Sequence, residues 1–303
     1  MPLTNDQTID GLSYRSHLRD LAGIRGLTGI VVNGHAAEVH ALSLDEQTWG
    51  VQTACEEVGD QIAVIAGIYT ESTRVACEMA KRAADVGAHA LLIFPPNSLM
   101  FGGNARIELG HRFVEEVSAA TALPVILFQY PISTALSYSI DSLVYLCEKV
   151  SNIVAIKDLG SEPRTHERTI AALHGLSRPV NVLTSHSQWL GASLCLGARG
   201  IISGAGSVIA DRQRALFEAF SSESPNLLLQ RQLLAEMSLL VEAFYSPPYV
   251  DWQARMKMVL HHFGRIATAE VFPPLQTIKA DDWSRIEGLL AKVNLTAETL
   301  YSK

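Results

Sequence analysis

The stretch Asn152–Asp158 (NIVAIKD) has the composition of a β-strand that is buried on both faces and ends in two charged residues. Its apolar residues do not alternate with polar ones, as they would in a strand with one solvated face. Strands of this kind are typical of parallel sheets covered by helices. The pair Lys157-Asp158 falls at the carboxyl end of the strand, which is the end that carries the chemistry in such folds.

Similar apolar runs recur along the chain at intervals of about 30 residues, which is the length of a strand–helix unit. The intervening segments, for example Ser43–Val58 and Ile140–Lys149, have the pattern of amphipathic helices. Strict alternation predicts a doubly wound sheet or a closed barrel, and the lack of a GxGxxG or P-loop motif disfavours a nucleotide-binding sheet. The six other predicted strands are Gly26–Gly34, Gln61–Ile68, Gly87–Pro96, Leu123–Pro131, Arg178–Ser185 and Ala198–Gly206.

The end of the chain has helical patterns only, which begin at about Arg212. We therefore predict an α/β fold, a TIM (β/α)₈ barrel over residues 1–220, with a C-terminal helical region over residues 221–303. The first predicted helix begins at about Ile9, and the few polar residues before it are too short for a barrel strand. Seven of the eight strands are thus accounted for, and we expect the first to be missing or truncated.

Composition and charge indicate a metabolic enzyme. The chain is 48% hydrophobic and carries a net charge of −7 without long basic runs, which disfavours nucleic acid and anionic membranes as partners. No signal peptide and no membrane-spanning apolar stretch is visible. We expect a cytoplasmic protein with buried, reduced thiols and no metal site, because no CxxC pair occurs. The cysteines are Cys55, Cys77, Cys147 and Cys195.

Lys157 is the most unusual of the strand-end residues. A lysine directly after an apolar run is partly withdrawn from water, and desolvation lowers the pKa of its amine toward the range that a nucleophile needs. The alternative is that Lys157 forms an ion pair with a carboxylate at the rim. Composition alone does not decide between the two.

Other polar residues follow the predicted strands. The Ser203–Ser207 stretch offers small side chains and free backbone N–H groups, which suits a carboxylate or phosphate, although a plain turn is an equal alternative. His35, His186 and Tyr130 are candidate proton donors or hydrogen-bonded rim residues. The histidines of the predicted helices are expected at the surface: His166, His174, His261 and His262.

Several short motifs together resemble those of the dihydrodipicolinate synthase / N-acetylneuraminate lyase family of class I aldolases, of which this chain would be a divergent member. The most specific is Ile156-Lys157-Asp158, which is similar to the family's IK[ED] Schiff-base motif. Gly34–Glu38 stands in the place of the GTTGE loop, and Pro131 in that of the YNxP turn. Further matches are Leu42-Ser43, Ile65–Gly67, Pro95-Pro96, Ser203–Val208 and Phe272–Leu275.

The resemblance implies a barrel with C-terminal helices that forms a homo-oligomer, a dimer or more commonly a tetramer, and needs neither metal nor added cofactor. It also implies that Lys157 attacks the C2 carbonyl of pyruvate or a longer 2-oxo acid. The resulting imine is an electron sink for aldol chemistry or for loss of water or ammonia. Pro2-Leu3 and Ile9-Asp10 match the turn that follows the family's first strand, which agrees with a truncated start.

Departures from the family pattern concern the proton relay. Phe128 stands where the family has its catalytic tyrosine, and Tyr130, on the same face of the strand, is a candidate replacement. The two threonines of GTTGE are His35 and Ala36 here. The synthase and neuraminate lyase activities are therefore both disfavoured.

The sequence thus predicts a Schiff-base lyase, an aldolase or dehydratase, acting on pyruvate or a longer 2-oxo acid such as a 2-oxo-3-deoxy sugar acid. The alternative is a non-catalytic paralogue that binds 2-oxo acids, and retention of the lysine argues against it. Lys157 and Tyr130 are the predicted catalytic residues. The predicted substrate-binding residues are Gly34, His35, Ala36, Ala37, Phe128, His186, Ser203, Gly204 and Ser207.

Overall fold

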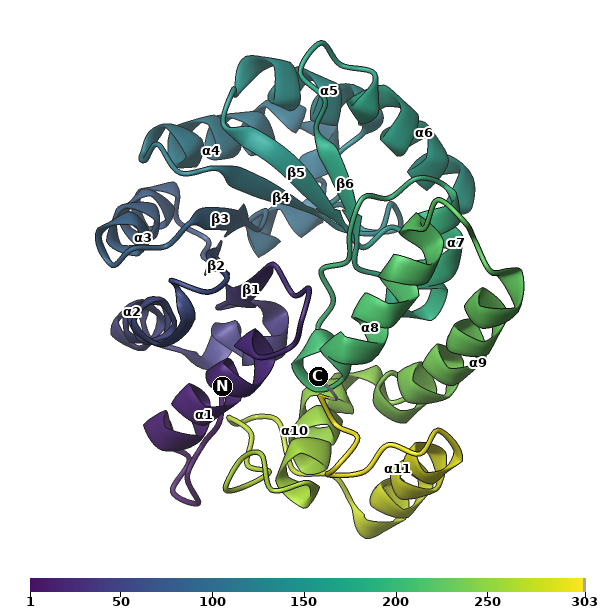
Figure 1. The fold of residues 1–303 in the computed structure, drawn as a ribbon. Coiled ribbons are helices and arrows are strands. Elements are labelled where there is room, and N and C mark those ends of the chain that lie inside the picture. Colours follow the sequence, from purple (N-terminus) through teal and green to yellow (C-terminus); the bar gives the residue numbers. More distant parts are fainter. Residues whose placement is uncertain (302–303) are drawn as a thin grey trace. The chain divides into compact units, whose positions relative to one another are not determined.

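The computed structural model describes residues 1–301 and divides them into two compact units (Figure 1). The sheet unit comprises Gly29–Gly34 and Ser43–Ser203. The helical unit comprises Met1–Thr28, His35–Leu42 and the chain from Gly204 onward. The predicted division at residue 220 stays a prediction.

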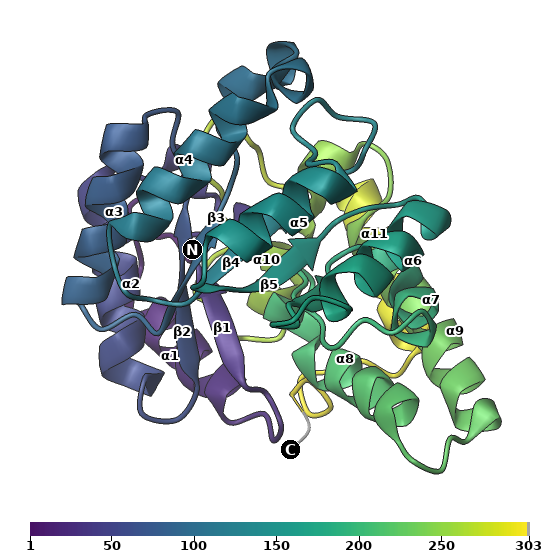
Figure 2. The same cartoon turned by 90° about the horizontal axis from the view of Figure 1, so that it is seen from above.

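The sheet unit contains six parallel strands that are paired in sequence order. Helices follow the strands and lie on the outside of the curled sheet (Figures 1 and 2). The strands are β1 (Gly29–Val32), β2 (Ala63–Ile68), β3 (Ala90–Ile93), β4 (Val125–Gln129), β5 (Ile153–Asp158) and β6 (Asn181–Thr184). The helices are α2 (Leu44–Val58), α3 (Thr73–Asp85), α4 (Ile107–Ala119), α5 (Ile140–Lys149), α6 (Pro163–His174) and α7 (Leu190–Cys195).

Local sequence signals set the helix ends. α2 begins after Ser43, whose hydroxyl accepts from the backbone N–H of Glu46. The Glu46 carboxylate in turn accepts from the backbone N–H of Ser43, which completes a capping box. Ser139 caps α5 in the same way by accepting from Ser142. α5 spans the residues predicted for it.

Six of the seven predicted strands are confirmed as strands, and the seventh is not. The Ala198–Gly206 run meets the sheet only through a parallel bridge between Ile201 and Thr184. A Cβ on Gly200 would lie 2.9 Å from the Leu183 side chain, so the segment approaches β6 closely there and then leaves it in a turn. The sheet of the described residues is therefore six-stranded.

The beginning of the chain is part of the helical unit. Leu3 is fully buried and forms an isolated antiparallel bridge with Ile9. The truncated first strand stays a prediction.

Alternation along the strands directs one set of side chains to a buried cluster on the inner face of the sheet. Val31, Ile65 and Leu183 pack against this cluster from β1, β2 and β6. Its buried members are Leu92, Phe94, Ile126, Phe128 and Ala155. This face matters for the site, because Lys157 lies two residues beyond Ala155.

The helical unit contains five α-helices among its described residues: α1 (Gly11–Ala22), α8 (Gly206–Ser221), α9 (Leu227–Phe244), α10 (Trp252–His262) and α11 (Ala280–Lys292). α8 begins six residues before the predicted Arg212 and has non-helical dihedral angles at Ile209. Arg255 of α10, almost fully buried, donates to the carboxylate of Asp282 on α11 at 2.7 Å. Within residues 1–301 no helix has the length and apolar character of a membrane span.

The cysteines correct one expectation. All four are free thiols, but only Cys147 is buried and Cys195 is exposed. The prediction of four buried thiols is therefore wrong: Cys195 is the last residue of the short helix α7, and its side chain faces solvent.

Candidate active site

Lys157 lies near the carboxyl end of β5, on the inner face of the sheet. The apolar residues before it form the strand, and the two-residue period directs Ala155 and Lys157 inward and Asp158 toward the helices. In the register of the sheet Lys157 is flanked by Phe128 on β4 and Leu183 on β6. Both neighbours are apolar.

The amine of Lys157 is buried and unpaired. Only 8% of the residue is exposed, and Nζ lies 4.7 Å from the centre of the Phe128 ring. Among residues 1–301 it forms neither a hydrogen bond nor an ion pair. Burial lowers the pKa of Lys157 from 10.5 to about 8. A rim ion pair, the alternative left open by the sequence, is therefore not present in this part of the chain.

Four aromatic side chains form a continuous row beside Lys157, which we call the aromatic wall: Tyr69, Phe94, Phe128 and Tyr130. Ring centroids are 5.7 Å apart for Tyr69 and Phe94, 4.8 Å for Phe94 and Phe128, and 4.5 Å for Phe128 and Tyr130. These residues stand at the carboxyl ends of β2, β3 and β4. The sequence singled out Phe128 and Tyr130 only. Tyr69 and Phe94 directly follow Ile68 and Ile93, so the ends of the neighbouring strands were the signal.

Tyr130 is a neutral phenol in this environment. Burial raises the pKa of Tyr130 well above its usual value, and electrostatic repulsion from Tyr69 and Glu71 adds a smaller effect in the same direction. A neutral hydroxyl donates a hydrogen bond but is a poor proton acceptor. The predicted role of Tyr130 in a proton relay stays a prediction.

A second set of polar groups lies on the helix side of β5. The Asp158 carboxylate contacts His166 Nδ1 at 2.7 Å, and His166 Nε2 lies 2.7 Å from the hydroxyl of Ser193. His166 is 2% exposed, so the prediction that it is a surface residue is wrong. The reason is that α6 turns this residue toward the sheet, where a strand-end carboxylate satisfies it.

The order Asp–His–Ser invites comparison with a hydrolase triad, but burial excludes that role. Ser193 is fully buried in α7 and has no access to a substrate. The network instead connects the segments that follow β5 and β6. Gly160 N donates to Asp158 at 2.6 Å, and Trp189 Nε1 donates to the Gly160 carbonyl at 3.1 Å. We interpret it as a support for these two loops.

The loops after β6 and after the bridged segment also carry polar groups. Ser187 and Ser203 hydroxyls are 2.8 Å apart, and both residues are half-buried. Burial lowers the pKa of His186, which favours its neutral form. The structure thus places Lys157, Phe128, Tyr130, His186, Ser203 and Gly34 in the sheet unit.

The other predicted substrate-binding residues lie in the helical unit: His35, Ala36, Ala37, Gly204 and Ser207. His35–Ala37 form a 3₁₀ turn. A Cβ on Gly204 would lie 2.8 Å from the Trp252 ring and 3.4 Å from Cβ of Ala36, so these three residues are packed together. Ser207 is in the first turn of α8, and its carbonyl accepts from the hydroxyl of Tyr301.

Glu38, at the end of the loop that resembles GTTGE, is fully buried and has a left-handed backbone. Its carboxylate lies 2.6 Å from Lys257 Nζ and accepts from the backbone N–H of Phe272 at 2.7 Å. Lys257 also donates to the carbonyl of Glu270 at 2.7 Å. Sequence reasoning did not identify this ion pair, because its partners are over 200 residues apart.

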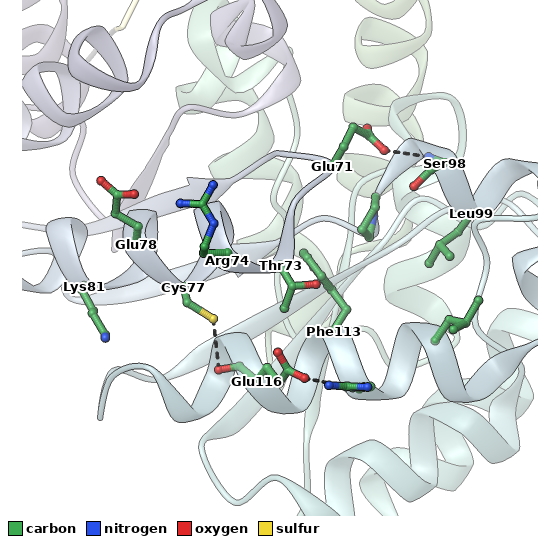
Figure 3. A pocket seen from close by; sticks show the side chains of 13 residues that line it. Glu71, Thr73, Arg74, Cys77, Glu78, Lys81, Ser98, Leu99, Phe113 and Glu116 are labelled. Carbon is green, nitrogen blue, oxygen red and sulfur yellow. Dashed lines mark hydrogen bonds and ion pairs between the residues drawn. The ribbon is translucent and has the colours of Figure 1, made fainter.

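Two further features bear on where chemistry can occur. A groove of about 920 Å³ lies on the helix side of the sheet unit, between α3 and α4 (Figure 3). Charged side chains including Glu71, Arg74 and Glu116 line it, and none of the predicted site residues does. In residues 1–301 no group of three or more His, Cys, Asp or Glu is placed to hold a metal. We therefore place the candidate site at Lys157 rather than in the groove.

A sequence model of the Dihydrodipicolinate synthetase family matches residues 1–292. The chain belongs to this family. Its members include lyases of the class I aldolase superfamily, and the resemblance seen in the sequence is thereby confirmed.

Relatives of the Dihydrodipicolinate synthetase family differ in the activity that their names state. A 4-hydroxy-tetrahydrodipicolinate synthase of Symbiobacterium thermophilum is 29% identical over 219 residues, covering 72% of each chain. A putative mitochondrial 4-hydroxy-2-oxoglutarate aldolase of Coccidioides immitis is 26% identical over 220 residues, covering 72% of this chain and 69% of the relative. Membership of the family therefore does not specify the substrate.

Solved structures of the family have the same fold. YagE, a prophage protein of E. coli K12 determined in complex with pyruvate, superposes with a TM-score of 0.87 at 21% identity, covering 97% of this chain and 96% of that one. A dihydrodipicolinate synthase superposes with a TM-score of 0.85 at 23% identity, with coverages of 97% and 96%. The α/β fold with a curled parallel sheet and a C-terminal helical part is therefore that of the family's TIM barrels.

Proposed function

We propose that the protein is a Schiff-base lyase, an aldolase or dehydratase, in which Lys157 forms an imine with pyruvate or a longer 2-oxo acid. The observation that carries the proposal is the buried, unpaired amine at the inner-face end of β5. Its pKa of about 8 leaves a useful fraction of neutral amine at physiological pH. The pyruvate complex of YagE, a member of the same family, supports a 2-oxo acid as the substrate class.

The reaction begins when the Nζ lone pair attacks C2 of the substrate. The carbinolamine loses water, and the resulting protonated imine draws electrons from C3. In a retro-aldol cleavage the C4 hydroxyl loses its proton to a base, the C3–C4 bond supplies the electron pair, an aldehyde leaves, and the enamine that remains takes up a proton at C3. In a dehydration a C3 proton is lost to form the enamine, and the C4 hydroxyl then takes up a proton and leaves as water. Protonation as required and hydrolysis of the imine release the product and regenerate the amine.

The residues around Lys157 have distinct parts in this proposal. Burial among Phe128, Leu183 and Ala155 lowers the pKa of Lys157, which raises the fraction of neutral amine, and excludes bulk water from the imine. Tyr130, held neutral, serves as a hydrogen-bond donor on the same side. The Ser187–Ser203 hydroxyl pair is suited to the substrate carboxylate. His186 and the predicted residues of the helical unit stay predicted substrate contacts, and no metal or cofactor beyond the lysine imine is proposed.

The alternative is a 2-oxo-acid-binding protein without turnover. A desolvated amine lowers the stability of the fold unless it is used, and this favours the enzyme. Both the lyase and the non-catalytic protein would bind a 2-oxo acid, but only the lyase would form a product from it. Turnover of any 2-oxo acid that depends on Lys157 decides for the lyase.

We further propose a cytoplasmic homo-oligomer, a dimer or tetramer. The four free thiols fit a reducing compartment. Exposed apolar side chains at the start of α4 and before it fit an interface with a second copy. These are Met100, Phe101, Ile107 and Leu109.

Trapping with borohydride tests the central proposal. The protein is incubated with pyruvate, reduced, and weighed intact, and the labelled peptide is sequenced. We expect one reduced pyruvate on Lys157. The Lys157→Met variant should take up none, whereas Lys149→Met, which removes an exposed lysine of α5, should label like the wild type. Absence of an adduct across a panel of 2-oxo acids, or an undiminished adduct on Lys157→Met, would contradict the proposal.

A further inference from the structure

The surroundings of Lys157 point to the chemical nature of the substrate beyond its 2-oxo acid head. We propose that the tail of the substrate is apolar, and most favourably aromatic, rather than the polyhydroxylated chain of a sugar acid. The inference rests on the proposed function, because it concerns the compound that forms the imine with Lys157. It is carried by the aromatic wall and by the apolar residues on the other side of the lysine.

The aromatic wall provides the first step. Phe128 lies against Nζ at 4.7 Å, and Phe94 continues the wall from it at 4.8 Å. The carbon that bonds to Nζ therefore stands beside Phe128, and the atoms that follow it meet ring faces and edges. Phe94 and Phe128 are fully buried, whereas Tyr69 and Tyr130 are half-buried at the open end of the wall. A planar tail has ring partners along this row at ordinary stacking distances.

The opposite side of Lys157 is apolar as well. Leu183 is its register partner on β6, and Leu159 and Ile202 pack against the same inner cluster. A chain that turned away from the aromatic wall would meet these aliphatic groups. The residues of the sheet unit that pack in these two directions are aliphatic or aromatic.

Two polar contacts involve the wall and the loops that follow β6 and the bridged segment. The hydroxyl of Tyr69 accepts a hydrogen bond from Asn97 Nδ2 at 2.6 Å. The hydroxyls of Ser187 and Ser203 pair with each other at 2.8 Å and suit the carboxylate at the head of the substrate. Hydroxyl groups buried against the remaining carbon surface would lose their water without gaining partners. This loss should weaken the binding of a sugar acid, and contacts with the rings should strengthen the binding of a compound with an aryl group.

Competition between three probes tests the inference on the wild-type protein. Imine formation is measured by borohydride trapping at increasing concentrations of pyruvate, 2-oxo-4-phenylbutanoate and 2-oxo-3-deoxygluconate. We expect the phenyl compound to half-saturate Lys157 at a concentration at least tenfold below that of the sugar acid, a difference of about 1.4 kcal/mol. An equal or lower half-saturation for the sugar acid overturns the inference while leaving the lyase proposal standing. No adduct with any of the three overturns both.

A pair of variants separates the wall from general effects on folding. Phe94→Leu removes one ring and keeps an apolar side chain, and it should reduce the ratio of aromatic to sugar-acid affinity several-fold. Phe113→Leu makes the same change at a buried aromatic of α4 outside the wall, and its ratio should match that of the wild type. Because each ratio is taken within one preparation, a partly unfolded sample does not alter it. An unchanged ratio in Phe94→Leu contradicts a contact between the tail and the wall.

Discussion

The pH dependence of imine formation at Lys157 is the sharpest test of the environment that the sheet provides. Burial lowers the pKa of Lys157 from 10.5 to about 8. Only the neutral amine attacks a carbonyl, so the rate of imine formation follows the fraction of Lys157 that is unprotonated. At pH 7 this fraction is ~10% for a pKa of 8 and ~0.03% for a pKa of 10.5. The buried site therefore supplies about 300 times more nucleophile than a solvated lysine.

The sign and window of the profile follow directly. As pH rises from 6 the rate should increase about tenfold per unit, bend near pH 8, and be flat from about pH 9 upward. A solvated lysine would give a rise that continues past pH 10. Pyruvate is fully ionised throughout, so its own titration does not enter.

A quench experiment measures this profile. The protein is mixed with pyruvate at each pH for a set time, and the imine is then trapped with excess borohydride at one fixed pH. Intact mass gives the fraction modified, and peptide mapping locates it. Exposed Lys149 in the same digest reports non-specific labelling. A rate that keeps rising tenfold per unit to pH 10 would refute the argument that burial depresses the pKa of Lys157.

Three predictions concern stability and are measured by urea or thermal unfolding. A Cβ on Gly67 would lie 2.1 Å from the backbone carbonyl oxygen of Asn33, so Gly67→Ala should lower the free energy of unfolding by about 2 kcal/mol or more. The control is Gly288→Ala in α11, where a Cβ has open space, and it should be neutral or stabilising by up to ~1 kcal/mol. Lys257→Met should lower the free energy of unfolding by about 3–5 kcal/mol, because Glu38 stays buried without its partner. Adding Glu38→Gln to this variant should restore part of the loss. If the losses of the two single variants simply add in the double variant, the pairing is contradicted. Burial lowers the pKa of His17 to about 4, so the unfolded chain binds the extra proton first and stability should fall by about 3 kcal/mol between pH 6.5 and 4. His17→Gln should flatten that slope, and an unchanged slope would count against it.

Much of the fold could be predicted because its signals are local. The apolar runs predicted six strands with boundaries off by a few residues, and α5 spans the residues expected for it. The capping box at Ser43 is a contact between residues three apart, which sequence inspection detects. The seventh run failed because strand formation needs a partner along its whole length, and Ala198–Gly206 meets β6 at one residue only.

The candidate site was predictable in part for the same reason. The apolar run before Lys157 and the IK[ED] motif identified the lysine, and Phe128 was recognised as a change in the relay. His166 was misplaced, because a helical pattern does not say which residue will meet the strand-end carboxylate of Asp158. The ion pair between Glu38 and Lys257 was not predicted, because no local sequence pattern relates two residues so far apart in the chain.

The sequence by itself determined that Lys157 stands at the carboxyl end of a buried strand, since a period of two and an apolar run are properties of one segment. Only the tertiary structure decided that its neighbours are Phe128 and Leu183, and that within the described chain it has no ionic partner. It also decided that Phe94 and Tyr69 extend the ring of Phe128 into a wall. The physical reason is that side chains on adjacent parallel strands meet through the register of backbone hydrogen bonds, which joins residues about 30 positions apart.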